Sequence, residues 1–415
     1  SITSGGNYNV VVGDEAGTAL TTGDNNVAIG FEALKTEDAD GNNVAVGYRA
    51  LKTLNAGGDG NNVAVGYITG QSVTTGHSNT LLGALAADAL TEGDENVAIG
   101  KHALGGETLG NYSVAIGSAA LKAQNFTTST SAYNVAVGRG AGQAVTTGQY
   151  NTLVGGIAGD AKTTGNGDVA IGYQALSADV AGQNSTAVGR AALSAQNFTT
   201  ATNTYNVAVG RGAGTSVTTG LQNTLVGALA GDALTDADYN VALGYLALST
   251  DTLGSKSTAL GQRALGTQNF TTATDSLNTA VGYQAGTEVT TGIKNVLIGA
   301  LAGDALTDAD QNVAVGHLTL SADVLGSHSV AVGNNALRRQ NFTTATDTYN
   351  VAVGDDAGTQ VTTGQYNTLI GAQAGDAITT GGSNVAVGYF ALSTEDGHGL
   401  NVAVGNRALA NQNAG

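Results

Sequence analysis

The stretch Asn43-Val44-Ala45-Val46-Gly47-Tyr48-Arg49-Ala50-Leu51 decides the fold, because its first five residues recur in close variants from Asn9–Gly13 to Asn401–Gly405. The motif occurs 23 times in the 415 residues, and 17 of its 22 spacings are 17 residues. A short period maintained through a chain is typical of one small unit stacked on itself. The sequence therefore predicts one continuous parallel β-solenoid over residues 1–415, with no linker.

With the motif glycine called G, position G−1 is Val, Ile or Leu and position G−3 is Val or Thr in all 23 copies. This alternation over a short run indicates a strand. Position G+3, mostly Ala, predicts a second short strand in each coil, and the polar residues and glycines between predict turns. Position G−4 is Asn in 18 copies. We expect these side chains to form a structural ladder at one corner, with a ligand-binding row as the alternative.

Position G−2 lies between the two strand positions and points to the opposite face, where it is again apolar. A strand that is apolar on both faces is normally covered on both. Because so long an apolar stripe exceeds what a soluble monomer exposes, we expect copies of the chain to cover it. Three copies around an axis are favoured, and two remain an alternative. The predicted interface residues are Ala136, Leu153, Ala208, Leu225, Ala280 and Leu297.

The spacings also follow a superperiod of 72 residues, formed by three steps of 17 and one of 21. Each longer step carries a segment that begins Gln-Asn-Phe-Thr-Thr. The four segments are residues 124–133, 196–205, 268–277 and 340–349. Insertions in a solenoid form loops on one face, often the binding face.

Two interpretations of these loops stay open: they contact a receptor, or they pack on a neighbouring protomer or coil corner. The candidate contact residues are Phe126, Thr127, Phe198, Thr199, Phe270, Thr271, Phe342 and Thr343. A single Phe in a polar loop more often anchors the loop, so the threonines are the better candidates. Four loops on each of three chains would bind with avidity.

The composition excludes several functions. A net charge of −17 argues against nucleic acid or an anionic membrane as partner, and no apolar run approaches a membrane span. Without Cys there is no thiolate nucleophile or Cys-ligated metal. No catalytic constellation is visible, so we expect no enzyme activity, metal or cofactor. Asp236 with Asp238 and Asp308 with Asp310 suggest Ca²⁺ only weakly, and solvated surface groups are favoured. The start at Ser1 leads us to expect a processed product or a fragment.

Two known repeat families resemble this chain over nearly its whole length. Ser113-Val114-Ala115-Ile116-Gly117 and Ser329-Val330-Ala331-Val332-Gly333 resemble the YadA-like head repeats of trimeric autotransporter adhesins. Residues 43–51 and 384–392 are similar to the "NTAVGYQAL" repeats of phage tail-fibre proteins. The resemblance implies a left-handed parallel β-roll in an intertwined or side-by-side homotrimer. The period here is longer than that of adhesin heads.

The function expected from these observations is that of a trimeric tail-fibre shaft, which attaches a phage to a host-surface glycan or protein. Its location would be the virion tail fibre or the cell exterior. The head domain of a trimeric bacterial surface adhesin is one alternative. A purely structural extracellular filament subunit is the other. In each case the chain's first partner is itself, and neither nucleic acid binding nor membrane insertion is expected.

Overall fold

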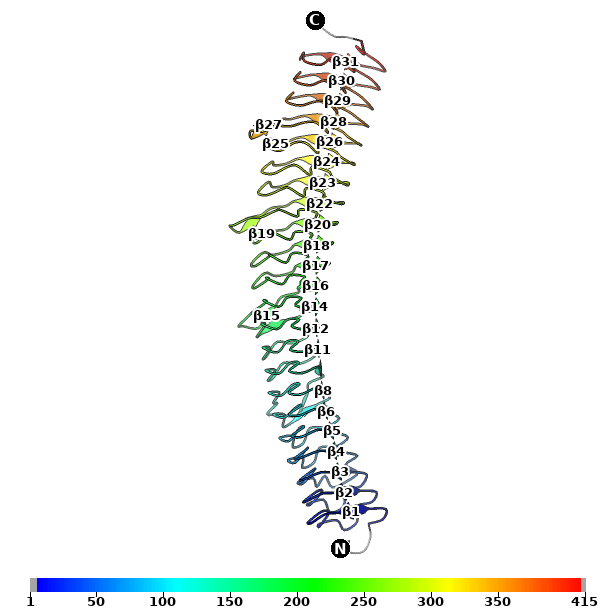
Figure 1. The fold of residues 1–415 in the computed structure, drawn as a ribbon, viewed down its shortest axis with the longest axis vertical. Helices are drawn as coiled ribbons and strands as arrows, with labels where there is room; N and C mark the ends of the chain where they lie inside the picture. Colours follow the sequence, from blue (N-terminus) through cyan, green and yellow to red (C-terminus); the bar gives the residue numbers. More distant parts are fainter. Residues whose placement is uncertain (1–5, 412–415) are drawn as a thin grey trace. The chain divides into compact units, whose positions relative to one another are not determined.

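The computed structural model describes residues 6–411, which form two compact units that divide after Asn206. The described residues contain strands and turns and no helix. Within each unit, every coil contributes one three-residue strand, and the strands of successive coils pair in parallel (Figure 1). The prediction of an all-β parallel solenoid is therefore confirmed.

Each main strand covers positions G−3 to G−1. In the first unit the main strands are β1 (Val10–Val12), β2 (Val27–Ile29), β3 (Val44–Val46), β4 (Val63–Val65), β5 (Thr80–Leu82), β6 (Val97–Ile99), β8 (Val114–Ile116), β10 (Val135–Val137), β11 (Thr152–Val154), β12 (Val169–Ile171) and β14 (Thr186–Val188). In the second unit they are β16 (Val207–Val209), β17 (Thr224–Val226), β18 (Val241–Leu243), β20 (Thr258–Leu260), β22 (Thr279–Val281), β23 (Val296–Ile298), β24 (Val313–Val315), β26 (Val330–Val332), β28 (Val351–Val353), β29 (Thr368–Ile370), β30 (Val385–Val387) and β31 (Val402–Val404). Pairing keeps equivalent positions opposite one another, as Ala98 of β6 opposes Ala115 of β8.

The second strand predicted around G+3 is wrong, because this part of the coil is a turn. The residues at G+2 and G+4 adopt left-handed backbone conformations, as His102 (φ 56°) and Leu104 (φ 54°) do on either side of Ala103. Such alternation bends the backbone too sharply for a strand. Ala103 nevertheless points inward and is fully buried. Leucine rarely adopts this conformation, so a Leu at G+4 does not indicate it.

The interior of each coil is filled by the side chains at G−2, G+3, G+4 and G+7. Where G−2 is Leu instead of Ala, glycine gives it room. A Cβ atom on Gly142 would lie 2.7 Å from Leu153 Cδ1, and one on Gly159 would lie 2.9 Å from Leu153 Cδ2. These distances are too short for real carbon contacts, so the larger side chain and the two glycines form one packing unit.

The row at G−4 forms the predicted ladder, and its side chains are buried. The backbone N–H of Asn96 donates to Asn79 Oδ1 at 2.9 Å. Asn79 Nδ2 in turn donates to the carbonyl of Gly93, also at 2.9 Å. Repetition of these bonds satisfies backbone groups that would otherwise be buried at the corner without partners. The structural interpretation of this row is confirmed.

The four longer coils each form a small two-stranded parallel flap with the preceding coil. The flaps are β7 (Gly110–Asn111) with β9 (Thr130–Ser131), β13 (Gly182–Gln183) with β15 (Thr202–Asn203), β19 (Gly254–Ser255) with β21 (Thr274–Asp275), and β25 (Gly326–Ser327) with β27 (Thr346–Asp347). The labelled flap strands, β15 in the first unit and β19, β25 and β27 in the second, project away from the main strands of their own unit (Figure 1).

Candidate functional site

The six residues predicted at the interface between copies lie inside the coils. Their side chains are fully buried within a single chain, so they cannot face a partner. They are Ala136, Leu153, Ala208, Leu225, Ala280 and Leu297. The prediction reversed the two faces of the strand, because apolar residues occupy both. The Asn side chains at G−4 lie on the same side of the strand as G−2 and are buried with it, as Asn96 and Asn134 are.

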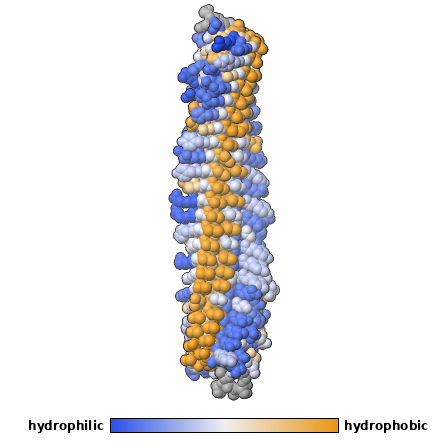
Figure 2. Space-filling view, turned by 90° about the vertical axis from the view of Figure 1, so that its right-hand side faces the viewer, coloured by the Kyte–Doolittle hydropathy of each residue, from blue (hydrophilic) through white to orange (hydrophobic). Residues whose placement is uncertain are grey.

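The outward face of the strands is formed by the side chains at G−3 and G−1, and we call it the outer face. Even where neighbouring coils stack on both sides, the side chains of Leu82 and Leu243 are each 45% exposed. Figure 2 shows hydrophobic side chains gathered in a band that runs along the stack, from coil to coil. A soluble monomer rarely exposes a contiguous apolar band of this kind.

The outer face carries no charge. Position G−3 holds only Val or Thr, and G−1 holds only Val, Ile or Leu, in a chain of net charge −17. The acidic side chains are therefore displaced to other parts of the coil. An uncharged surface on an acidic protein is one on which two copies can meet without bringing carboxylates together.

Aromatic side chains border the outer face on both sides. Every tyrosine of the chain occupies either G−5 or G+1, and all are exposed. Those at G−5 are Tyr8, Tyr112, Tyr133, Tyr150, Tyr205, Tyr239, Tyr349 and Tyr366, and those at G+1 are Tyr48, Tyr67, Tyr173, Tyr245, Tyr283 and Tyr389.

Some tyrosines at the same position in successive coils stack, as Tyr133 does on Tyr112 (5.1 Å between ring centroids) and on Tyr150 (5.9 Å). Stacked rings cover each other's faces and leave their edges and hydroxyl groups exposed. An aliphatic centre with an aromatic, partly polar border is typical of protein interfaces. The tyrosine rows were not predicted from the sequence, although each tyrosine lies at a fixed distance from G.

In the flaps, the Phe and Thr residues predicted to contact a receptor differ in exposure. The side chains of Phe126, Phe198, Phe270 and Phe342 are at most 9% exposed, so they anchor the flaps. Thr127, Thr199, Thr271 and Thr343 are exposed. The Phe side chains are therefore wrong as contact residues, in line with the anchoring preference drawn from the sequence.

A buried carboxylate holds each flap to the preceding coil. In the second unit, Asp251 Oδ1 accepts the backbone N–H groups of Gly254 and Phe270, each at 3.0 Å. Asp251 Oδ2 accepts Gln268 Nε2 at 2.6 Å, and Gln268 Oε1 accepts Asn278 Nδ2 at 2.9 Å. The same pair of bonds is made by Gln124 with Glu107 and Asn134 and by Gln340 with Asp323 and Asn350, so the Gln amide links the carboxylate to the corner ladder in these flaps.

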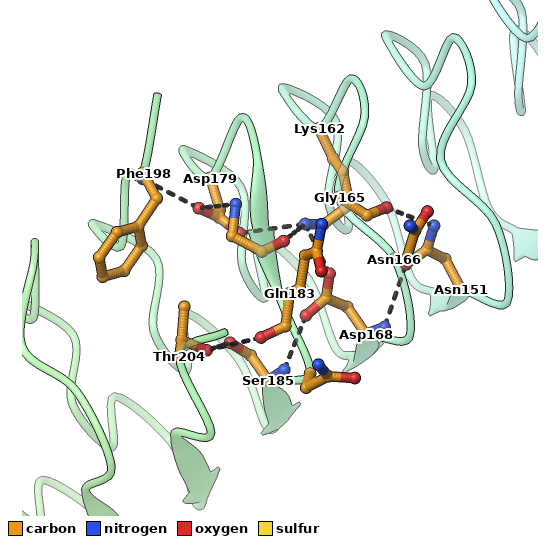
Figure 3. A network of polar contacts seen from close by, with 12 residues as sticks. Asn151, Lys162, Gly165, Asn166, Asp168, Asp179, Gln183, Ser185, Phe198 and Thr204 are labelled. Atoms are coloured by element: carbon orange, nitrogen blue, oxygen red, sulfur yellow. Dashed lines mark hydrogen bonds and ion pairs between the residues drawn. The ribbon is translucent and has the colours of Figure 1, made fainter. Parts of the chain in front are cut away.

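One coil of the first unit buries a lysine (Figure 3). Lys162 occupies G+7, where the equivalent residue 72 positions later is Leu234. Its ammonium group lies 2.6 Å from Asp168 Oδ2, 3.0 Å from Asp179 Oδ2 and 2.7 Å from the carbonyl of Gly182. Burial raises the pKa of Asp168 to about 6, although the Lys162 ammonium opposes the shift. All three charged side chains are fully buried.

The carboxylates considered for Ca²⁺ accept hydrogen bonds from the neighbouring coil. Asp236 Oδ1 accepts Thr219 Oγ1 at 2.6 Å, and Asp238 Oδ1 accepts the backbone N–H of Leu221 at 2.7 Å. Among residues 6–411, Glu395, Asp396 and His398 form the one cluster with metal-binding spacing. In this cluster Glu395 Oε1 accepts hydrogen bonds from the backbone N–H and from Nδ1 of His398. The same carboxylate oxygen is thus bonded to two donors of one residue.

No family model matches the chain, and no curated protein matches it. The structure between residues 6 and 411 contains no helix long and apolar enough to cross a membrane.

Proposed function

We propose that the chain is a shaft segment of an extracellular or virion fibre, in which three copies pack through their outer faces and the flaps point outward to a cell surface. The observation that carries this proposal is the uncharged, aliphatic outer face with its border of tyrosines. The phage tail fibre is the first candidate because of the similarity of residues 43–51 to tail-fibre repeats. The head of a bacterial surface adhesin is the second.

The partner that best fits the outer face is another copy of this chain. The face repeats one strand spacing per coil, about 4.8 Å, and a copy offers side chains at the same interval. Burial of aliphatic side chains that are more than a third exposed would supply the free energy of association. The net charge of −17 opposes contact through other parts of the coil.

The flaps are the parts that would meet a receptor. They project away from the main strands, so packing through the outer faces leaves them free (Figure 1). Their exposed threonines provide hydroxyl groups, which suit hydrogen bonds to the hydroxyls of a glycan. A weak contact repeated on every flap becomes firm attachment through avidity.

An array of bacterial surface polysaccharides tests this function. We expect the purified chain to bind one glycan class, and a variant with Ala at Thr127, Thr199, Thr271 and Thr343 to bind it more weakly. These side chains are exposed, so the variant should fold normally. An assembled protein that binds neither polysaccharides nor intact bacterial cells would contradict a role in attachment to cells. It would favour the alternative function of a purely structural filament subunit.

A further inference from the structure

The two rows that border the outer face differ in composition from coil to coil. The row at G−5 precedes each strand and the row at G+1 follows it, so they lie at opposite edges of the same strand. In the first unit, Glu95 and Lys101 border β6, whereas Tyr133 and Arg139 border β10. All four side chains are exposed.

The bases of the G+1 row have no acidic partner within the first unit. None of the ion pairs among the described residues includes Lys101, Arg139 or Arg190. Glu95 is likewise in no ion pair there. Charged groups at the border of an apolar face without partners in their own chain are available to a second chain.

Symmetry decides which residues of two copies would meet. If copies pack in parallel around an axis that runs along the stack, the G−5 edge of one copy faces the G+1 edge of the next, and equal coils lie at equal height. If copies pack antiparallel, G−5 edges face G−5 edges of different coils.

The sequence is complementary under the parallel arrangement. The coil of β6 is the one coil with charges at both edges, and their signs are opposite: Glu95 at G−5 and Lys101 at G+1. No coil carries like charges at its two edges. The same matching places Tyr133 against Arg139, which allows a cation–π contact, and Asn184 against Arg190, which allows a hydrogen bond.

We propose that copies of this chain associate in parallel and in register, with Glu95 of one copy paired to Lys101 of the next. This inference rests on the proposed function for its premise that copies meet through the outer face. It adds the direction, the register and the residues that enforce them. The charged pair at the border selects the correct alignment, because a repetitive aliphatic face alone would permit sliding by a whole coil.

Charge reversal tests the pairing. We expect Glu95→Lys and Lys101→Glu each to raise the concentration at which the assembly dissociates by about tenfold, because like charges then face each other at every interface. The double variant Glu95→Lys/Lys101→Glu should restore the wild-type value. Sedimentation velocity over a dilution series at low salt measures this concentration.

Mixing separates contacts between chains from contacts within one chain. A mixture of the two single variants, unfolded and refolded together, should assemble better than either variant alone, because an interface between unlike chains regains the pair. Glu92→Lys is the control: it makes the same charge change at an exposed site of the same coil, away from the outer face. Its dissociation should match the wild type.

The outcomes are distinct. Single variants that dissociate like the wild type, or a double variant no better than the singles, would overturn parallel in-register pairing while leaving the outer-face assembly intact. Rescue in the double variant but not in the mixture would assign the pair to one chain and overturn the proposal as well. A wild-type chain that is monomeric would contradict the proposed function itself.

Discussion

The ammonium group of Lys162 lies 2.6 Å from the carboxylate of Asp168, and both side chains are fully buried between adjacent coils. In the next superperiod, Leu234 stands at the position of Lys162 and Asn240 at the position of Asp168. The lysine and the aspartate therefore occur as a pair where the other coil has an apolar and an amide side chain. A buried charge needs its partner, and the paired substitution supplies it.

Removal of one partner should therefore cost far more than removal of both. We expect Lys162→Leu to lower the free energy of unfolding by about 3–5 kcal/mol, because it leaves Asp168 buried beside Asp179 without a cation. The double variant Lys162→Leu/Asp168→Asn should be near neutral or more stable by about 1–4 kcal/mol. Guanidinium unfolding measures both. A double variant as unstable as the single would contradict this account of the pair.

Stability should fall as the pH rises from about 4 to about 8. Burial and the neighbouring Asp40 raise the pKa of Glu37 from 4.5 to about 8, and the pKa of Asp168 rises from 3.8 to about 6. The folded state thus holds protons that the unfolded state has released, and raising the pH through this window favours unfolding. Thermal melts at intervals of pH test the sign, and Glu37→Gln should flatten the upper part of the profile.

The flap anchor predicts a specific incompatibility. Asp251→Asn sets one amide N–H group against another, because Gln268 Nε2 donates to Asp251 Oδ2 in the wild type. We expect a loss of about 1–3 kcal/mol and faster hydrogen exchange at the Phe270 N–H. Asp251→Asn/Gln268→Glu returns an acceptor to the site and should recover part of the loss. No recovery would mean that the carboxylate acts through its backbone bonds alone.

Leu153 tests the corrected orientation of the strand. Because it fills the coil interior, Leu153→Ala should lower the free energy of unfolding by about 2–5 kcal/mol and leave the assembled mass of the folded protein unchanged. An interface residue would behave in the opposite way, with a reduced mass and little change in the stability of the isolated chain. Light scattering combined with denaturant unfolding distinguishes the two.

The period of the sequence was sufficient to predict the solenoid, the parallel register and the Asn ladder, because each depends on a position that recurs in every coil. It was not sufficient to orient the strand, since Ala at G−2 and Val at G−1 are both apolar. The left-handed backbone conformation of Leu104 could not be predicted either. Closure of the coil imposes it, against the local preference of leucine.

The candidate site was predicted in part. The segments after Gln124 and its equivalents were expected to be loops on one face, and they form the flaps. The buried role of Phe126 was anticipated as a preference, whereas the carboxylate beneath it was not, because Glu107 lies a full coil earlier in the chain. The tyrosine rows required only a comparison of residues at fixed distance from G.

The central claim is that the outer face is an interface between copies, and its most direct test is the mass of the native protein when that face is charged. Leu243→Asp/Leu260→Asp places carboxylates on side chains that are 45% and 40% exposed, so folding of the chain should survive. Thr271→Asp/Thr272→Asp, on an exposed flap, is the matched control. We predict light-scattering masses near three times 40.8 kDa for the wild type and the control, and near 40.8 kDa for the outer-face variant. A wild-type mass of 40.8 kDa at every concentration, or an outer-face variant that keeps the wild-type mass, would contradict the account.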